Sequence, residues 1–339
     1  TGHFFERENM YAAYPEEHFD IYKYTPTFAV AFGAIGVFPD LIGLHIWNIL
    51  NVFILLFAIY YLPRLSKFNK GLIILISLTQ LITSIQNEQS NGLIVGLIIL
   101  AFGLMERKKL FLAAFCICVA IFVKPFGIVA FALFLLYPNR IKSILYSLIC
   151  MISLFLLPIL FVGLADYQIM ISQFLEMLSA DHSESLGLSV MGFLEAWFGI
   201  GSYKLIILSV GVVIFLIPFA FIKNYTSYNF RLLQLCSVLM WIIMFNHKAE
   251  SPTYIIATIG VAIWFVSSNK GWIDTSLFVF AFVFICLSPT DLIPKTIRFE
   301  VINPLVLQIP PLLLIWLRIL YTSITSSNKE NKPQLEAIS

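Results

Sequence analysis

Residues Leu110–Tyr137 read LFLAAFCICVAIFVKPFGIVAFALFLLY, an apolar stretch in which Lys124 is the only charged residue. A helix needs about 20 consecutive apolar residues to cross a bilayer. Pro125 interrupts the stretch, because proline lacks a backbone donor and ends or kinks a helix. A lysine at such depth costs about 2.5–3.5 kcal/mol on insertion scales. Lys124 therefore either snorkels to the headgroups at a helix end or holds an anionic group.

The whole chain resembles this stretch in composition. Of its 339 residues 60% are hydrophobic and 12% are charged, whereas a soluble domain is about 25% charged. This composition excludes a soluble enzyme and a disordered chain, and it predicts an all-α polytopic membrane protein. The segment 27–38 is too short to cross, so we expect an interfacial helix there. Eleven apolar runs are candidate full or partial passes: 41–62, 71–85, 92–105, 110–123, 126–137, 143–164, 205–222, 231–245, 252–266, 273–288 and 304–322.

The basic residues orient these runs, because cytoplasmic loops are enriched in lysine and arginine. Six basic clusters, at 64–70, 107–109, 140–142, 223–231, 270 and 329–332, all fall on one side of an eleven-pass model, which we take as the cytoplasmic side. The longest predicted loop, 165–203, has no basic residue and five acidic ones, so we expect it outside. Three regions result: 1–40 as a non-cytoplasmic loop with the interfacial helix, 41–322 as the membrane domain, and 323–339 as a flexible cytoplasmic tail.

Four cations lie on the predicted outer side, against the general bias. They are Lys124, Lys248, Lys295 and Arg298. Each is either an ordinary loop charge or part of a site for an anionic lipid headgroup. The polar segment 86–91 is either a hinge that caps two helix ends or a wall of hydrogen-bonding groups, in which Glu88 is the one carboxylate. His247 and Glu250 are spaced to share a helical face, or else are two solvated loop residues.

Nothing in the chain indicates a metal centre or a nucleotide. The five histidines are scattered, and Cys116 and Cys118 face different directions on a helix. No glycine-rich phosphate loop is present, so we expect no metal, no cofactor and no nucleic acid partner. The first 27 residues are acidic and aromatic, a composition that suits either a membrane interface or stacking against sugars.

Four segments carry a resemblance to glycosyltransferase family eighty-seven, whose members are polytopic enzymes of the GT-C type. YKYTPTFA at 22–29 resembles the family's entry after the first outer loop, and QNEQSNGL at 86–93 resembles its "G-Q-x-N-x-L" segment. AIFVKPF at 120–126 is similar to an element that ends in Lys-Pro, and NHKAESPTY at 246–254 stands where the family commonly has two histidines. The order and spacing of the first three segments fit the family.

The resemblance implies a membrane glycosyltransferase of the cell envelope, with its active site on the non-cytoplasmic face of a bacterial cytoplasmic membrane. The donor would be a hexose, mannose in many members, on a polyprenyl phosphate held among membrane lipids, and the acceptor a glycan or a lipid. The expected donor-phosphate residues are Lys124, Lys248, Lys295 and Arg298; the expected sugar or acceptor residues are Glu88, Gln89, Asn91 and Tyr24; and His247 and Glu250 are supporting candidates for catalysis.

Two departures from the family affect the expected chemistry. Residues 246–254 contain one histidine, His247, so its role does not follow from the family pattern. The family's catalytic aspartate follows its first membrane span, and we expect this aspartate to lie upstream of Thr1, so the catalytic base is unknown. Two other classes stay open: a transporter or flippase, which predicts midplane charges and an internal repeat, and a non-catalytic assembly subunit.

Overall fold

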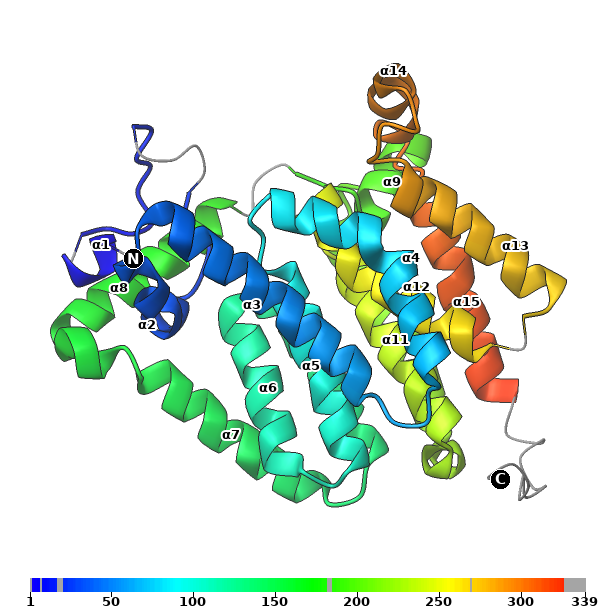
Figure 1. The fold of residues 1–339 in the computed structure, drawn as a ribbon, viewed down its shortest axis with the longest axis horizontal. Helices are drawn as coiled ribbons and strands as arrows, with labels where there is room; N and C mark the ends of the chain where they lie inside the picture. Colours follow the sequence, from blue (N-terminus) through cyan, green and yellow to red (C-terminus); the bar gives the residue numbers. More distant parts are fainter. Residues whose placement is uncertain (1, 7, 17–20, 182–184, 269, 326–339) are drawn as a thin grey trace. The chain divides into compact units, whose positions relative to one another are not determined.

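A computed structural model of the chain describes residues 2–6, 8–16, 21–181, 185–268 and 270–325 (Figure 1). These residues form fifteen α-helices and several shorter helical segments, without a strand in the described ranges. This confirms the prediction of an all-α polytopic membrane protein. The chain divides into two compact units, one of residues 1–70, 81–131 and 139–185 and one of residues 71–80, 132–138 and 186–339. Each unit is described by itself below.

The first unit is built on a layer of neighbouring helices. Its elements are α1 (Gly2–Phe5), α2 (Pro26–Gly33), η1 (Ala34–Val37), α3 (Asp40–Tyr61), α5 (Asn91–Glu106), α6 (Leu110–Val123), α7 (Arg140–Leu156) and α8 (Ile159–Asp181), with the two ends of α4 (Lys67–Gln86) and the start of the 3-10 helix η2 (Pro125–Leu136). Helix α5 packs between α3 and α6, and α6 packs in turn against α7 (Figure 1).

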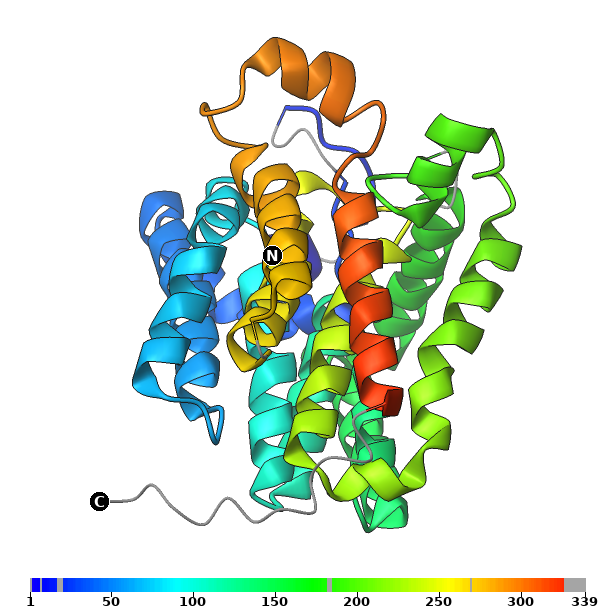
Figure 2. The same ribbon diagram turned by 90° about the vertical axis from the view of Figure 1, so that its right-hand side faces the viewer.

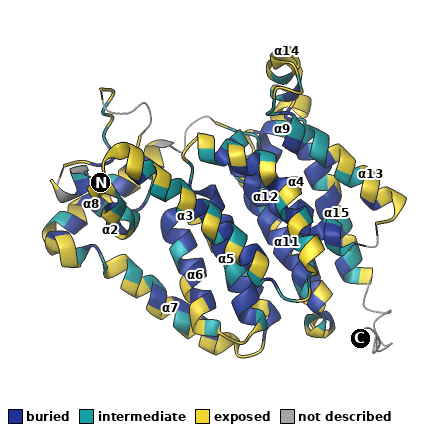
Figure 3. Cartoon of the chain, in the orientation of Figure 1, coloured by how far each residue is buried: buried dark blue, intermediate teal, exposed yellow. Residues whose placement is uncertain are grey.

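Close packing of α5 against α3 requires a residue without a side chain at Gly96. A Cβ atom there would lie 2.9 Å from Cγ2 of Ile54 and 3.0 Å from the backbone nitrogen of Leu55. Helices α5 and α6 are mostly buried, whereas α7 exposes large apolar side chains such as Ile141 and Leu148 (Figure 3). Apolar side chains on an outer face match the hydrocarbon of a bilayer.

The second unit contains the rest of the helices. They are α9 (Val190–Phe198), α10 (Lys204–Leu216), η3 (Ile217–Ala220), η4 (Ile222–Thr226), α11 (Tyr228–Met244), η5 (Ser251–Tyr254), α12 (Ile255–Ser267), α13 (Trp272–Ala281), η6 (Phe282–Leu287), α14 (Lys295–Ile297), η7 (Arg298–Ile302) and α15 (Ile309–Thr325). Helix α11 packs against α12 and α15. The indole of Trp316 donates to the hydroxyl of Ser237 at 2.8 Å, which fixes α15 on α11. Residues of α14 and η7 arch over the ends of α13 and α15 (Figure 2).

Each of the eleven predicted apolar runs forms helical structure, but few helices have the full length of a membrane span. Three are long and apolar enough to cross by length and composition: α3, α4 and residues Ile159–Ala180 of α8. The other apolar helices have 10–17 residues. The run 126–137 forms the 3-10 helix η2, and the expected short helix at 27–38 is present as α2 and η1.

The prediction that 165–203 is a loop was wrong in its local structure. The structure places α8 and α9 there, and the segment with the predicted outer cations Lys295 and Arg298 forms α14 and η7. Helix α8 was missed because polar residues interrupt its apolar sequence, although Tyr167, Met170, Phe174 and Met177 have helical spacing and pack in one cluster with Phe4, Met10 and Tyr11. Gly163, with φ of 80°, breaks the helical geometry near its start. Of the predicted flexible tail, residues 326–339 lie outside the described residues, and α15 extends to Thr325.

Candidate functional site

Lys124 lies where α6 ends. Its backbone is extended, with φ of −143° and ψ of 129°, because Pro125 follows and the α-helix cannot continue through it. The backbone nitrogen of Lys124 still donates to the carbonyl of Ala120, whereas η2 begins with the next residue. The side chain of Lys124 is half-buried. The change from α-helix to 3-10 helix therefore turns a cation out of an apolar stretch and into a polar turn.

The polar turn comes from residues 87–90, between α4 and α5. The ammonium group of Lys124 donates to Oε1 of Gln89 at 2.8 Å and to Oδ1 of Asn91 at 3.3 Å. Asn91 is fully buried and is the first residue of α5. Both partners are neutral amide oxygens that accept hydrogen bonds, and they orient the ammonium group of Lys124.

Tyr24 reaches the same cation from the N-terminal segment. Its ring centroid lies 5.8 Å from Nζ of Lys124, within the range of a cation–π contact. Thr25 fixes this position, because its hydroxyl caps α2 and also donates to the carbonyl of Phe122 at 2.5 Å. The last carbonyls of a helix have no partner within the helix, so this bond stabilises the end of α6 as well. Segment 22–25 is thereby held against Lys124.

Two buried phenols support Tyr24 and take no part in acid–base chemistry. Tyr11 donates from its hydroxyl to the carbonyl of Tyr24 at 3.0 Å, and its ring contacts that of Tyr22. Burial raises the pKa of both phenols well above the usual value of 10. Both therefore stay protonated at any physiological pH, and neither serves as a general base.

Glu88 occupies a strained place in the turn. Its φ is 54°, a left-handed conformation that residues other than glycine seldom adopt. The indole of Trp47 on α3 donates to the backbone carbonyl of Glu88 at 3.1 Å and holds this conformation. The side chain of Glu88 is exposed, so its carboxylate is available to a ligand.

An aromatic groove of about 360 Å³ adjoins this turn. Tyr24, Phe28, Phe32 and Trp47 line it through stacked and edge-on ring contacts, with centroids 4.3–5.8 Å apart. The carboxylates of Glu88 and Asp40 are its charged groups, and its other lining residues are Ile35, Gly36, Phe38, Gly43 and Leu44. The groove therefore combines a long apolar wall with two carboxylates, beside the residue Tyr24 that contacts Lys124.

The predicted residues of 246–250 lie in the second unit. Residues 187–188 pack against this turn: the backbone nitrogen of Leu188 donates to the carbonyl of Ala249 at 2.8 Å. Gly187 permits the approach, since a Cβ atom there would lie 2.6 Å from the carbonyl oxygen of His247. Glu250 directly precedes η5, and its backbone nitrogen donates to the hydroxyl of Thr253 at 3.1 Å. His247 and Lys248 are half-buried, and the carboxylate of Glu250 is exposed.

Lys295 and Arg298 lie in the arch formed by α14 and η7. Arg298 donates from its guanidinium to the carbonyl of Pro289 at 2.7 Å and lies 5.0 Å from the ring centroid of Phe299. Its Nε atom is buried and has no hydrogen-bond partner among the described residues. Lys295 is exposed at the start of α14. Arg298 is thus used in part to hold the arch together.

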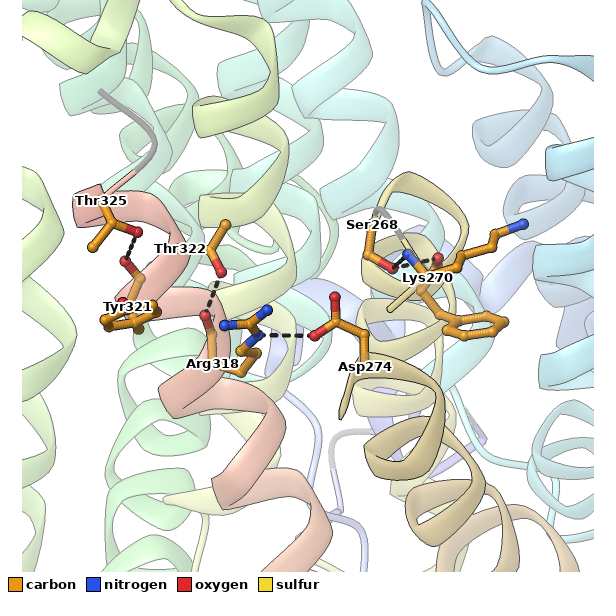
Figure 4. Close-up of polar contacts among 8 residues, drawn as sticks. Ser268, Lys270, Asp274, Arg318, Tyr321, Thr322 and Thr325 are labelled. Atoms are coloured by element: carbon orange, nitrogen blue, oxygen red, sulfur yellow. Dashed lines mark hydrogen bonds and ion pairs between the residues drawn. The ribbon is translucent and has the colours of Figure 1, made fainter. Parts of the chain in front are cut away.

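The structure also pairs two charges that the sequence reading missed. Nε of Arg318 on α15 donates to Oδ1 of Asp274 on α13 at 2.8 Å (Figure 4). The side chain of Asp274 is 9% exposed and that of Arg318 is 33% exposed. Asp274 and Arg318 each lie inside a predicted apolar run. Because a lone charge is costly there, two opposite charges in such runs indicate that they pair with each other. Thr25 and Trp47, which position Tyr24 and Glu88, were also missed because their roles depend on tertiary contacts.

One histidine lies beside two glutamates in the N-terminal segment. His3, Glu6 and Glu8 bring one possible ligand atom each within 4.8 Å of one another. Nδ1 of His3 lies 2.6 Å from a carboxylate oxygen of Glu8, and its ring stacks on Tyr14. Both glutamates are exposed.

These features define a class: a helical membrane protein in which a broken helix places a cation beside an aromatic, carboxylate-bearing groove. Comparison with protein families then identifies the group. The model of glycosyltransferase family 87 matches residues 22–244, so the chain belongs to that family and is a membrane glycosyltransferase. The matched region includes Tyr24, Glu88, Gln89, Asn91 and Lys124. No protein of the curated collection matches the chain.

Proposed function

We propose that this protein transfers a hexose from a polyprenyl phosphate to a glycan or lipid acceptor, with mannose as the first sugar to test. The proposal rests on the position of the Lys124 ammonium group. Its cation is held by Gln89 and Asn91 at a helix end, beside the ring of Tyr24. A phosphate leaving group gains negative charge as the sugar departs, and a fixed cation stabilises that charge.

The groove beside Tyr24 supports the rest of the assignment. Its aromatic rings suit both the apolar start of an isoprenoid chain and the face of a sugar. Glu88, which lines it, accepts a hydrogen bond from a hydroxyl group of the sugar or acceptor. Gln89 and Asn91 in this scheme hold Lys124 and contribute amide groups to the same headgroup.

The residues of the second unit enter the proposal as a second group. Lys248, Lys295 and Arg298 supply further positive charge for the donor phosphate, and His247 and Glu250 support the acceptor. Arg298 also donates from its guanidinium to the carbonyl of Pro289. We propose the non-cytoplasmic face of a bacterial cell membrane as the location of the site, on the distribution of the basic residues.

The proposal is tested by transfer from a defined donor. The full-length protein, purified in detergent, is given radiolabelled mannose on a polyprenyl phosphate and, separately, as a nucleotide sugar, with membrane lipids and glycans as acceptors. We expect transfer from the lipid-linked donor alone. Lys124→Ala should lower this rate by about 100-fold, the typical effect of removing one transition-state charge contact.

The control is Lys67→Ala, which removes an exposed cation at the first residue of α4 and should leave the rate unchanged. Transfer from the nucleotide sugar alone would overturn the donor class. Uptake or exchange of the intact lipid-linked sugar across vesicles, without transfer, would instead support a flippase.

A further inference from the structure

The opposite end of α6 carries a second basic feature that sugar transfer does not use. A pocket of about 350 Å³ lies between the start of α6 and the start of α7. Lys108, Lys109 and Lys142 line it, with Asn139, Phe111 and Tyr146. Helix α6 has 14 residues, so about 21 Å of helix separate this pocket from Lys124.

Two helix N-termini open into this pocket without a side-chain cap. Lys109 precedes α6 and Asn139 precedes α7, and neither makes a capping hydrogen bond through its side chain. Asn139 is left-handed, with φ of 65°, which turns the chain sharply into α7. The first N–H groups of a helix lack internal partners and carry partial positive charge, so they bind anions.

The lysines add full charges to these partial ones. Lys108, Lys109 and Lys142 are exposed, and no ion pair joins their ammonium groups to a carboxylate among the described residues. Three cations and two uncapped helix starts around one cavity form a site for a phosphate group.

The surroundings of the pocket identify the source of the phosphate. Tyr146 meets Phe111 edge-on, with ring centroids 5.6 Å apart, as amphipathic rings do at the level of lipid headgroups. Near these two rings in the sequence, α6 exposes Leu112 and Phe115, and α7 exposes Leu145 and Leu148. A free phosphate would use the charges only, whereas a phospholipid also covers these apolar side chains with its acyl chains.

We propose that the pocket between the starts of α6 and α7 binds the headgroup of an anionic phospholipid. The phosphate lies among Lys108, Lys109 and Lys142, and the acyl chains follow the exposed apolar faces of the two helices. Basic pockets between membrane helices bind anionic headgroups in this way, at about 1 kcal/mol for each lysine near the surface.

The test is native mass spectrometry of the full-length protein with an equimolar mixture of phosphatidylglycerol and phosphatidylcholine. The wild type should retain phosphatidylglycerol preferentially. Lys109→Gln/Lys142→Gln should lower that preference by about 10- to 30-fold, since two lysines are lost. Lys109→Arg/Lys142→Arg, which keeps the charge, should retain the preference and show that the positions tolerate substitution.

The matched control is Lys67→Gln/Lys223→Gln, which removes two exposed lysines outside the pocket. It should leave the preference unchanged. An equal loss in both pairs of variants, or no loss in either, would overturn the proposal. Glycerol phosphate is added as a competitor, and displacement of the lipid at equal concentration would show a site for soluble phosphate instead.

Discussion

The two ends of α6 carry positive charge in different ways. At its C-terminal end a half-buried Lys124 is oriented by two amide oxygens and an aromatic ring. At its N-terminal end three exposed lysines surround an open pocket. A cation within an apolar stretch needs fixed partners because its desolvation is costly, whereas exposed lysines need none. Ordered partners indicate selective chemistry, and open charges indicate attraction to a charged surface.

Arg318 shows a third arrangement, in which a cation links two helices. Arg318 is bonded directly to the carboxylate of Asp274, so the charge of one offsets that of the other (Figure 4). Such a pair links α13 to α15 and leaves little net charge for an anionic ligand. The hydrogen bonds of Lys124 to Gln89 and Asn91 differ because amides do not carry an opposing charge. Amide oxygens therefore orient the cation of Lys124, whereas a carboxylate holds that of Arg318 and links two helices.

The largest effect is expected when Lys124 is given a carboxylate partner, like the one that Arg318 has. Gln89→Glu places a carboxylate 2.8 Å from Nζ of Lys124 with almost no change in shape. We expect the rate of sugar transfer to fall by about 10- to 30-fold, because the new charge competes with the donor phosphate. Transfer rates at saturating acceptor measure the effect.

The thermal stability of Gln89→Glu provides the control, since the new ion pair should keep or raise the melting temperature. Gln89→Asn shortens the side chain without adding charge, and we expect a smaller loss of rate than for Gln89→Glu. An unchanged rate in Gln89→Glu would mean that the charge of Lys124 is not used.

A smaller effect is expected from breaking the structural pair. Asp274→Asn leaves the guanidinium of Arg318 without its opposite charge and should destabilise the fold by about 1–2 kcal/mol. The value is below that of a fully buried pair because the Arg318 side chain is one-third exposed. Thermal unfolding in detergent measures the change, with the exposed Asp291→Asn as the control.

The rate of sugar transfer distinguishes a structural role of the Asp274–Arg318 pair from a role in the active site. Asp274→Asn should retain the wild-type rate at a temperature where it is folded. Loss of activity without loss of stability in this variant would place the pair in the site and contradict its structural role.

Part of this account follows from the sequence and part does not. The eleven apolar runs predicted helices, because hydrophobicity alone decides which segments leave water. The exceptional place of Lys124 between two apolar runs was visible for the same reason. The resemblance assigned Lys124 to the donor phosphate and Gln89, Asn91 and Tyr24 to the sugar or acceptor, and their contact with one another appears only in the structure.

Other features depend on contacts that a sequence does not display. Polar residues interrupt the apolar sequence of α8, so no continuous apolar run marks this helix. Its buried side chains pack in one cluster with Tyr11. Thr25 binds the end of α6, 97 residues away, so no local pattern marks it. Pairing of Asp274 with Arg318 was missed because basic residues were read as loop markers. Charges inside apolar runs would have been the better signal.

In the proposed function, Lys124 recognises the phosphate of a lipid-linked donor. The most direct measurement is the binding of a polyprenyl phosphate and of the corresponding polyprenol, which lacks the phosphate, to the wild type and to Lys124→Ala. We expect the variant to bind the phosphate form at least about 10-fold more weakly and the alcohol equally well. Equal weakening of both ligands, or no weakening of either, would contradict it.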